Sequence, residues 1–535
     1  MTAASKAVVH LRAQNHRKRL GLIFGSGASK DLGFPDWANL VERIGGDEGV
    51  DAAALLAQLR SEDSSQPVTQ SLASITHMLF DHFRDRRIKE LNLTGSITFL
   101  QEQSIKSEWL KIIHKQLYTG VDASKRKRTI EKHPYLTAFR DVIKNSPLTV
   151  NYNFDDTLEK LLIQSRTAEE QTHTRGYEVT DKPNAQFQKD SGVIYHPNGY
   201  LPSLFEDGAS AEVVFSNDAF QDQLISAANG RYVHLSNHLF RNTCLLIGLS
   251  LEDATLQSLL RQNAVTNPGH IHYIVHYLPA NSEVNKDTLD VIFRSNFTSY
   301  NLYTLFLDGQ GIKDLAELIL MHPDTFKMRY PKAVRKFVYY LVGSIGAGKS
   351  TAAGNFRNLI TYDEWVDERL PDLAKPQKDV GKTSIVNMDK WIADQFHKKN
   401  FMLQKAEESI HIIDRCPLDP LTFPGDKRAK AANLLKTITS DGSLLIEKGH
   451  IIFLDCEVAE LKIRNSFKHK YWPDEEIGGL LLEMEEVYSG LKQSRICTRG
   501  RTIGDVAREI AKIVFLEEYW PVDIADELQK FASAA

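Results

Sequence analysis

Cysteine is scarce in this sequence, with only four cysteines among 535 residues. They are Cys244, Cys416, Cys456 and Cys497, and no two of them have the C-x-x-C spacing. Because a structural zinc site needs clustered thiolate or imidazole ligands, none is predicted. Isolated cysteines are typical of proteins in a reducing compartment, so a cytoplasmic location is expected.

Long apolar runs and a strong excess of one charge are also missing. No run of about 18 apolar residues occurs, so no membrane-spanning helix is expected, and residues 1–20 lack the pattern of a secretory signal. Lysine and arginine number 65 against 69 acidic residues, and this net charge of −4 gives no reason to expect nucleic acid as a main partner. The basic runs at 16–20 and 125–128 are expected to be solvated turns or helix ends.

The chain is too long for one hydrophobic core, because cores stop growing at roughly 250–300 residues. Apolar strands alternate with helical patterns in its front part, which predicts a Rossmann-like parallel sheet with helices on its faces. The expected strands are 20–24, 148–154, 192–196, 244–250 and 271–278, the expected helices are 37–44, 52–60 and 255–263, and 60–145 is expected to be a mostly helical insertion.

A polar, basic segment that contains Pro331 separates this part from a new apolar strand. The predicted organisation is therefore α/β throughout. It comprises a first domain at 1–325, a linker at 326–336 and a second domain at 337–535.

The segment GSIGAGKST follows the apolar strand expected at 337–343 and matches the phosphate-loop pattern G-x-x-x-x-G-K-[ST]. Its glycines let backbone N–H groups close on phosphates, its lysine reaches the terminal phosphates, and Ser350 can ligate Mg²⁺. The sequence therefore predicts an ATP site with Mg²⁺. Its expected residues are Gly343, Gly346, Gly348, Lys349, Ser350 and Thr351.

Three segments after this loop resemble, in their order, deoxynucleoside kinases and nucleoside-monophosphate kinases. They are an expected strand before Asp389, a strand that ends in Asp414 and Arg415, and a strand followed by a helix that carries Arg464. The resemblance implies that Asp389 is a substrate-side carboxylate, that Asp414 and Arg415 form a pair at the end of the central strand, and that Arg464 belongs to a lid. A helix N-cap at Asp389, a solvated helix face at Arg464, and nucleotide binding without turnover are alternatives.

A second glycine-rich stretch, GSGASKDLGFPDW, follows the first strand of the chain. Small residues at this place let a backbone approach a pyrophosphate at a helix start. The expected cofactor-binding residues of this glycine-rich turn are Gly25, Ser26, Gly27, Ala28 and Ser29. The longer stretch resembles the sirtuin signature, which implies that the loop with Pro35, Asp36 and Trp37 covers NAD.

Two later segments, NYNFDDTLE and GLSLED, also occur in sirtuin order. The resemblance implies that Asn153 holds the ribose of NAD⁺ or a water, that Asp155 orders the pocket, and that Gly248 and Ser250 contact the cofactor. For Asp155 a strand-end cap is the alternative. Together with YHPNGYLP, these segments resemble the SIR2-like domains of bacterial antiphage defence proteins, which hydrolyse NAD⁺ to nicotinamide and ADP-ribose. A protein deacetylase is disfavoured, because the chain lacks a zinc ribbon.

One residue departs from the pattern of these relatives, which usually have H-x-H-G-Y-L-P. In this sequence Asn198 stands where the second histidine, a general base, is expected, and His196 keeps the first place. Asparagine cannot take up a proton near neutral pH, and loss of an acid–base group costs roughly 10²–10⁴-fold in rate. Three explanations are open. Asn198 replaces a natural histidine, His196 serves instead, or the domain binds NAD⁺ without cleaving it.

The fusion of these two parts suggests a switch, because a toxic NADase needs control. ATP or a deoxynucleotide in the second part would then stabilise an active state of the first. The resemblance also implies a homo-oligomer and a phage trigger that the sequence does not identify. Two alternatives remain, namely a nucleotide kinase with a non-catalytic dinucleotide domain, and an assembly scaffold controlled by nucleotides.

Overall fold

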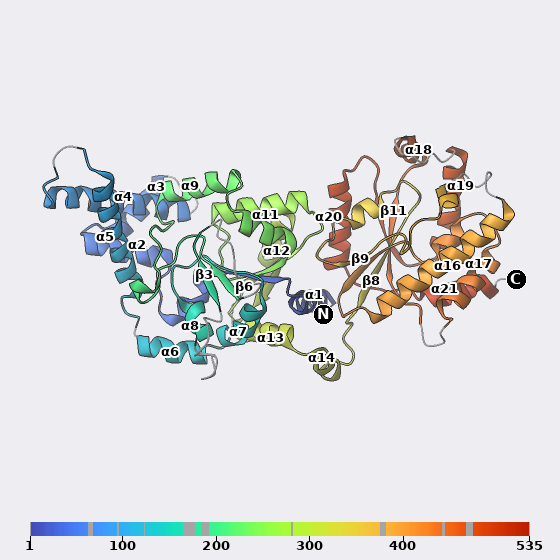
Figure 1. Cartoon of the computed structure of the whole chain (residues 1–535), viewed down its shortest axis with the longest axis horizontal. Helices are drawn as coiled ribbons and strands as arrows, with labels where there is room; N and C mark the ends of the chain where they lie inside the picture. Colours follow the sequence, from blue (N-terminus) through green and yellow to red (C-terminus); the bar gives the residue numbers. More distant parts are fainter. Residues whose placement is uncertain are drawn as a thin grey trace. The chain divides into compact units, whose positions relative to one another are not determined.

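The computed structural model of the chain (Figure 1) forms two compact units. We call Gln14–Ala264 and Ile271–His322 the front unit, and Met1–Ala13, Val265–His270 and Pro323–Ala535 the rear unit. The structure describes residues 2–62, 68–93, 96–121, 123–163, 177–182, 192–279, 282–374, 381–440, 445–466 and 474–533.

The front unit is built on a parallel sheet of seven strands in the order β3-β4-β2-β1-β5-β6-β7. This arrangement confirms the predicted α/β class. The strands are β1 (Leu20–Phe24), β2 (Thr149–Asn151), β3 (Glu178–Thr180), β4 (Val193–Tyr195), β5 (Thr243–Ile247), β6 (His272–Tyr277) and β7 (Leu302–Leu307). The sequence did not lead us to expect β3 and β7.

The centre of this sheet is fully covered, because every residue of β1 and β5 is buried. Such continuous apolar strands are typical of parallel sheets with helices on both faces. Phe24 is in register with Asn151 of β2 and with Ile247 of β5. The carboxyl ends of β1, β2 and β5 therefore lie at one level, which is where ligands bind in open α/β sheets.

Helices occupy most of the chain between β1 and β2, in agreement with the predicted helical insertion. The helix α5 has a capping box in which Thr98 and Gln101 bond to each other's backbone N–H groups. The front helices are α2 (Trp37–Glu48), α3 (Ala52–Glu62), α4 (Val68–Glu90), α5 (Phe99–Tyr118), α6 (Ala123–Lys132), α7 (Leu136–Asn145), α8 (Thr157–Ile163), α9 (Asn217–Ala228), α10 (Val233–Arg241), α11 (Ala254–Thr266), α12 (Lys286–Tyr300) and α13 (Gly309–Leu320).

The rear unit has its own parallel sheet of five strands in the order β12-β11-β8-β10-β9. Its strands are β8 (Phe337–Val342), β9 (Ile360–Tyr362), β10 (Ile410–Asp414), β11 (His450–Asp455) and β12 (Gln493–Cys497). Its helices are α14 (Pro323–Arg329), α15 (Lys349–Ala353), α16 (Lys382–Lys405), α17 (Lys427–Ile438), α18 (Val458–Ser466), α19 (Asp474–Tyr488), α20 (Ile503–Phe515) and α21 (Ile524–Ser533).

The strand expected before Asp389 was wrong, because residues 382–405 form α16. Met388 and Ala393 are buried, whereas Val386 is 53% exposed. This burial follows a helical period rather than the alternation of a strand. The strand next to β10, at one of the two edges of the sheet, is β9, a short segment that the sequence analysis missed.

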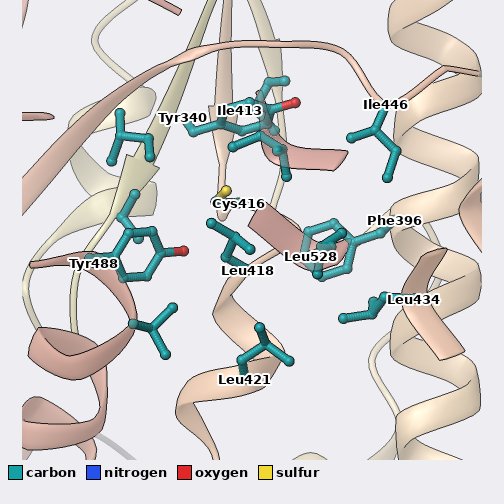
Figure 2. Packing of buried hydrophobic residues seen from close by; sticks show 14 of the residues in the cluster. Tyr340, Phe396, Ile413, Cys416, Leu418, Leu421, Leu434, Ile446, Tyr488 and Leu528 are labelled. Carbon is teal, nitrogen blue, oxygen red and sulfur yellow. The ribbon is translucent and has the colours of Figure 1, made fainter. Parts of the chain in front are cut away.

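The core of the rear unit lies between its sheet and four of its helices (Figure 2). Tyr340 and Ile413 come from strands of the sheet, whereas Phe396, Leu434, Tyr488 and Leu528 come from α16, α17, α19 and α21. Cys416 is completely buried among them, and burial raises the pKa of its thiol, so this cysteine is a packing residue.

The helix α1 (Thr2–His16) places its first residues in the rear unit, although the predicted boundary grouped 1–325 together. Lys6 is completely buried there, and its ammonium group donates to the carbonyls of Val514 (2.8 Å) and Glu517 (2.6 Å). Val514 lies in the last turn of α20 and Glu517 lies two residues after its end, where a positive charge is favourable. Burial lowers the pKa of Lys6 to about 8.

Among the described residues, no helix is both long and apolar enough to cross a bilayer.

Candidate functional site

A cavity of about 150 Å³ opens at the carboxyl ends of β1, β2 and β5. Phe34, Phe154, Phe215 and Phe220 are part of its wall. The predicted site residues that line it are Gly25, Ser26, Ser29, Pro35, Trp37, Asn153, Asp155, Asn198, Gly248 and Ser250. Four other predicted residues, Gly27, Ala28, Asp36 and His196, are not among its lining residues.

Two backbone segments touch at one end of this cavity, and glycine makes the approach possible. The N–H of Gly27 donates to the carbonyl of Gly248 at 3.0 Å, and a Cβ on Gly25 would lie 2.6 Å from that oxygen. Gly248 has φ +70°, and a Cβ on it would lie 2.5 Å from the nitrogen of Ala28. Gly27 and Ala28 therefore pack against the backbone of Gly248 and do not line the cavity.

This contact predicts different costs for two alanine substitutions at similar backbone angles. Gly230 has φ +72°, and a Cβ on it would meet no atom within 4 Å, so Gly230→Ala is expected to cost only the left-handed strain of about 1–2 kcal/mol. Gly248→Ala adds an overlap with Ala28, and its expected cost is about 2–5 kcal/mol in total. Chemical denaturation of both variants measures the difference, and equal costs would contradict the tight contact.

Asn153 follows β2 and is held in one orientation by its surroundings. Its Nδ2 donates to the carbonyl of Gly25 at 3.0 Å and to Ser29 Oγ at 3.2 Å. A carbonyl can only accept, so these bonds identify the nitrogen and the oxygen of the amide. Within the described chain, no donor is bonded to Asn153 Oδ1. The cavity is therefore lined by an amide oxygen that is free to accept a hydrogen bond.

Asp155 holds the hydroxyl of Ser29 that accepts from Asn153. Ser29 Oγ donates to its Oδ2 at 3.1 Å, and the N–H of Thr157 donates to its Oδ1 at 3.0 Å. Burial raises the pKa of Asp155, while its bonds with Thr157 act in the opposite direction. The carboxylate of Asp155 therefore binds the first N–H of α8 and also orients the hydroxyl of Ser29, which accepts from Asn153.

The start of α2 contributes to the aromatic wall of the cavity. Asp36 Oδ1 accepts from the N–H of Asn39 at 3.0 Å, so this carboxylate caps α2. Trp37 lies against Phe215 and Phe220, with ring centroids 5.9 and 5.2 Å away. Its Nε1 is buried and has no hydrogen-bond partner in the described part of the chain. Trp37 thus adds a planar aromatic surface to the wall of the cavity.

His196 does not face the cavity. The side chain is completely buried, with Nδ1 2.8 Å from the carbonyl oxygen of Asn153 and Nε2 2.8 Å from Glu159 Oε1. Burial alone would lower the pKa of His196, but Glu159 outweighs it and the pKa is raised. Both ring nitrogens are engaged, so His196 cannot take over the role of the missing base. It positions the backbone of Asn153. The sequence analysis missed Glu159, although it lies one helical turn after Asp155.

The buried pair of His196 and Glu159 predicts how stability depends on pH. The pKa of His196 is raised in the folded state, so its contribution is complete below the unfolded value of 6.5 and is lost as the pH rises through the folded value. We therefore expect the front unit to lose stability as the pH rises above about 6.5. Glu159→Gln should abolish this slope, with a cost of about 3–5 kcal/mol near pH 6.5.

Denaturant unfolding at several pH values measures this slope. Glu206→Gln is the matched control, because Glu206 is an exposed carboxylate of the same unit. A slope that persists in Glu159→Gln would show that another group is responsible.

Asn198 lies at the boundary of two cavities. It is 9% exposed and lines both the cavity described above and a neighbouring one of about 540 Å³, together with Val214 and Phe215. Its Oδ1 accepts from Gln223 Nε2 at 3.0 Å. Gln223 comes from α9 and has no sequence signal that would have identified it.

In the rear unit, the glycine-rich loop connects β8 to α15, as predicted. Gly343, Gly346 and Gly348 all have positive φ angles, of +148°, +91° and +99°. The ammonium group of Lys349 folds back on this loop and donates to the carbonyls of Gly343 (2.7 Å) and Ser344 (3.1 Å). Lys349 is buried, and burial lowers its pKa. The loop therefore encloses a cation whose only bonded acceptors in the described chain are backbone carbonyls.

Polar groups converge beside this loop at the end of β10. Ser350 Oγ donates to Asp414 Oδ2 at 2.5 Å, and Asp414 Oδ1 is buried without a hydrogen-bond partner among the described residues. Lys399 donates to the carbonyl of Asp414 at 2.8 Å, and burial lowers the pKa of Lys399 to about 8. Thr351 is exposed on α15.

Arg415 has φ +76°, which is rare for a residue with a side chain and costs of order 1–3 kcal/mol. Its guanidinium bonds to Glu364 Oε1 at 2.6 Å and lies 3.6 Å from Asp419. Burial would raise the pKa of Glu364, but Arg415 outweighs it and lowers the pKa. The sequence analysis missed Glu364, because it did not identify β9, which precedes it.

The remaining two predicted residues have different surroundings. Asp389 lies inside α16, so it is not the N-cap of a helix, and its carboxylate lies 3.9 Å from Lys430. Arg464 donates to the carbonyl of Thr498 at 2.8 Å and to that of Gly346 at 3.5 Å, so it contacts the glycine-rich loop.

No group of three or more His, Cys, Asp or Glu residues suited to a metal ion occurs among the described residues.

Residues 147–302 match the model of the SIR2-like domain. This range includes Asn153, Asp155, His196, Asn198 and the turn from Gly248 to Ser250. The SIR2-like family generally comprises NAD-dependent enzymes, so the match indicates an NAD-related activity for this region. No curated protein matches the chain.

Proposed function

We propose that the front unit binds NAD⁺ at the carboxyl ends of β1, β2 and β5 and hydrolyses it to nicotinamide and ADP-ribose. The observation that carries this proposal is the amide of Asn153. Its nitrogen is bound to Gly25 and Ser29, and its oxygen is left as an acceptor on the cavity wall. The match of 147–302 to the SIR2-like domain supports NAD⁺ as the ligand.

The chemistry requires a positioned acceptor more than a strong base. Nicotinamide leaves as the C1′–N bond breaks and takes the electron pair into its ring, which removes the positive charge of that ring. The ribose then has oxocarbenium character, and a water that donates to Asn153 Oδ1 attacks C1′ and releases a proton to solvent. Because such a carbon is strongly electrophilic, hydrolysis proceeds without a histidine at position 198, at a reduced rate.

The size of the cavity requires the dinucleotide to extend beyond it. Ligand sites measure roughly 300–1,000 Å³, whereas this cavity has about 150 Å³. The neighbouring cavity of about 540 Å³ shares Asn198, Val214 and Phe215 with it. We propose that NAD⁺ occupies both and that the segment with Val214 and Phe215 adjusts around it.

For the rear unit we propose a nucleotide site at the glycine-rich loop, favoured by the enclosed ammonium group of Lys349. Mg²⁺ prefers oxygen ligands, and Ser350 Oγ with the unpartnered Asp414 Oδ1 fits such an ion. Mg²⁺ would supply charge neutralisation of the phosphates, while Lys349 and Arg464 hold them in place. The product analysis described below tests whether this site transfers a phosphate to a nucleoside or nucleotide, or only binds the nucleotide.

Fusion of these sites suggests the role of the whole chain. We propose antiphage defence by depletion of NAD⁺, with the bound nucleotide as regulator and a homo-oligomer as the assembly. This role rests on the resemblance to SIR2-like defence proteins. A nucleotide kinase with a non-catalytic front unit is the second candidate, favoured by the convergence of Lys349, Asp414 and Arg415.

One experiment separates these functions. The purified chain is incubated with NAD⁺, ATP, Mg²⁺ and a panel of deoxynucleotides, and all products are identified by mass spectrometry. Nicotinamide and ADP-ribose in equal amounts support NAD⁺ hydrolysis. Intact NAD⁺ without calorimetric binding would end the proposal, and phosphorylated nucleosides alone would favour the kinase. A nucleotide-dependent change in size-exclusion profile, without turnover, would favour a scaffold.

A further inference from the structure

Gln223 of α9 links three elements around position 198. Its Nε2 donates to the carbonyl of Pro197 at 3.1 Å and to Asn198 Oδ1 at 3.0 Å, and its Oε1 accepts from Thr255 Oγ1 at 3.1 Å. The side chain is 4% exposed, so each of these bonds is made away from solvent. The backbone of Asn198 is held as well, because its carbonyl accepts from the N–H of Val214 at 2.8 Å.

These contacts determine which atom of Asn198 is left for a ligand. The carbonyl of Pro197 accepts only, so the atom of Gln223 that faces it must be nitrogen. The same nitrogen faces Asn198, so the atom of Asn198 that meets it must be oxygen. Asn198 Nδ2 then has no partner in the described chain, and this donor belongs to a residue that lines the cavity with Asn153.

We infer that Gln223 is a positioning residue that makes position 198 a hydrogen-bond donor, which contacts an acceptor oxygen of the bound dinucleotide. The inference rests on the proposed function for the identity of that ligand. Asn153 presents an acceptor and Asn198 presents a donor, so the cavity offers a complementary pair to a ribose or carboxamide group. A side chain at position 198 that can only accept hydrogen bonds would face the acceptor oxygen of this ligand without forming a hydrogen bond.

The same contact has a consequence for a histidine at this place. In Asn198→His, ring Nδ1 takes the place of Oδ1 and meets the donor of Gln223. The proton of a neutral ring is then on Nε2, which faces the cavity as a donor and cannot act as a base. A carboxylate at position 223 reverses this arrangement, because it accepts from Nδ1–H and leaves Nε2 free to take a proton.

The tautomer is measured directly by ¹⁵N nuclear magnetic resonance of the Asn198→His protein, selectively labelled at histidine. We expect protonation at Nε2 in this variant and at Nδ1 in the double variant Asn198→His with Gln223→Glu. This measurement needs neither NAD⁺ nor turnover. A ring protonated at Nδ1 in the single variant would overturn the inference even if the protein hydrolyses NAD⁺.

Catalysis gives the second readout. With Asn198→His alone, the rate of NAD⁺ cleavage should show no new dependence on the titration of a histidine base between about pH 5 and 9. The double variant should be about tenfold or more faster than the single variant, with a rate that rises through a pKa above the usual 6.5 of histidine, because the carboxylate raises it. A single variant as fast as the double variant, with the same pH dependence, would overturn the inference.

Binding tests the wild-type role of Gln223. Gln223→Glu turns the amide of Asn198 around, because the carboxylate attracts its nitrogen, and NAD⁺ affinity measured by calorimetry should fall about tenfold or more. The matched control is Gln221→Glu, which adds the same charge at an exposed position on α9. Equal affinities of the two variants would overturn the inference, whereas a wild-type chain that binds no NAD⁺ would end the proposed function instead.

Discussion

Asn153→Ala is expected to lower the rate of NAD⁺ cleavage by about 10²–10³-fold, which is the usual effect of removing one preorganised polar group from a reacting centre. The substitution removes the acceptor Oδ1 that positions water or ribose. It also leaves the carbonyl of Gly25 and the hydroxyl of Ser29 without the donor that now joins them. Initial rates of nicotinamide release at saturating NAD⁺ measure the effect on kcat.

A second substitution at this position separates chemistry from packing. Asn153→Asp keeps the shape but places a charged acceptor against the carbonyl of Gly25, so it should lose as much activity as Asn153→Ala. The control is Asn229→Ala, because Asn229 is an exposed residue after α9 and not among the residues that line the cavity. Retention of more than a tenth of the wild-type rate in both Asn153 variants would contradict the assigned role.

Lys349→Met is expected to weaken binding of ATP with Mg²⁺ by about 10–100-fold, because hydrogen bonds to a charged group contribute roughly 1.5–3 kcal/mol. The lysine is buried and bonded to the carbonyls of Gly343 and Ser344 in this structure. These neutral acceptors are replaced by phosphate oxygens when a nucleotide binds, and the negative charge offsets the burial that now lowers the pKa of Lys349. Calorimetric titration with a non-hydrolysable ATP analogue measures the loss.

Lys390→Met is the matched control for this prediction, since Lys390 is an exposed lysine of α16 in the same unit. It should bind the analogue like the wild-type chain. If regulation by nucleotide is correct, Lys349→Met also removes any effect of ATP on NAD⁺ cleavage. Unchanged ATP affinity in Lys349→Met would remove the basis for a nucleotide site at the glycine-rich loop.

A comparison of predicted and observed strands shows which strands a local sequence pattern can identify. The continuous apolar runs that became β1, β5 and β8 were predictable, because a strand buried on both faces must be apolar throughout. Residues 384–391 were not predictable in the same way. They contain β-branched residues, but the burial of Met388 beside the exposed Val386 depends on the neighbours of α16, which a window of sequence does not contain.

His196 illustrates the same limit for the candidate site. The sequence left open that His196 serves in place of the expected histidine at position 198, whereas its ring lies between the carbonyl of Asn153 and the carboxylate of Glu159. Neither partner is close in sequence, at separations of 43 and 37 residues. The direction in which a ring points depends on such distant partners, so the sequence alone could not determine which groups this histidine contacts.

The sequence by itself determined which residue types gather at the carboxyl ends of the strands, because parallel strands deliver the segments that follow them to one edge of the sheet. It also determined where glycine permits two backbones to touch. Only the tertiary structure decided which atom each side chain presents there. The amide nitrogen of Asn153 is bound to the carbonyl of Gly25, 128 residues away, so its oxygen is left unbonded within the described part of the chain. The amide oxygen of Asn198 is bound to the nitrogen of Gln223, 25 residues away, so its nitrogen is the atom left for a ligand.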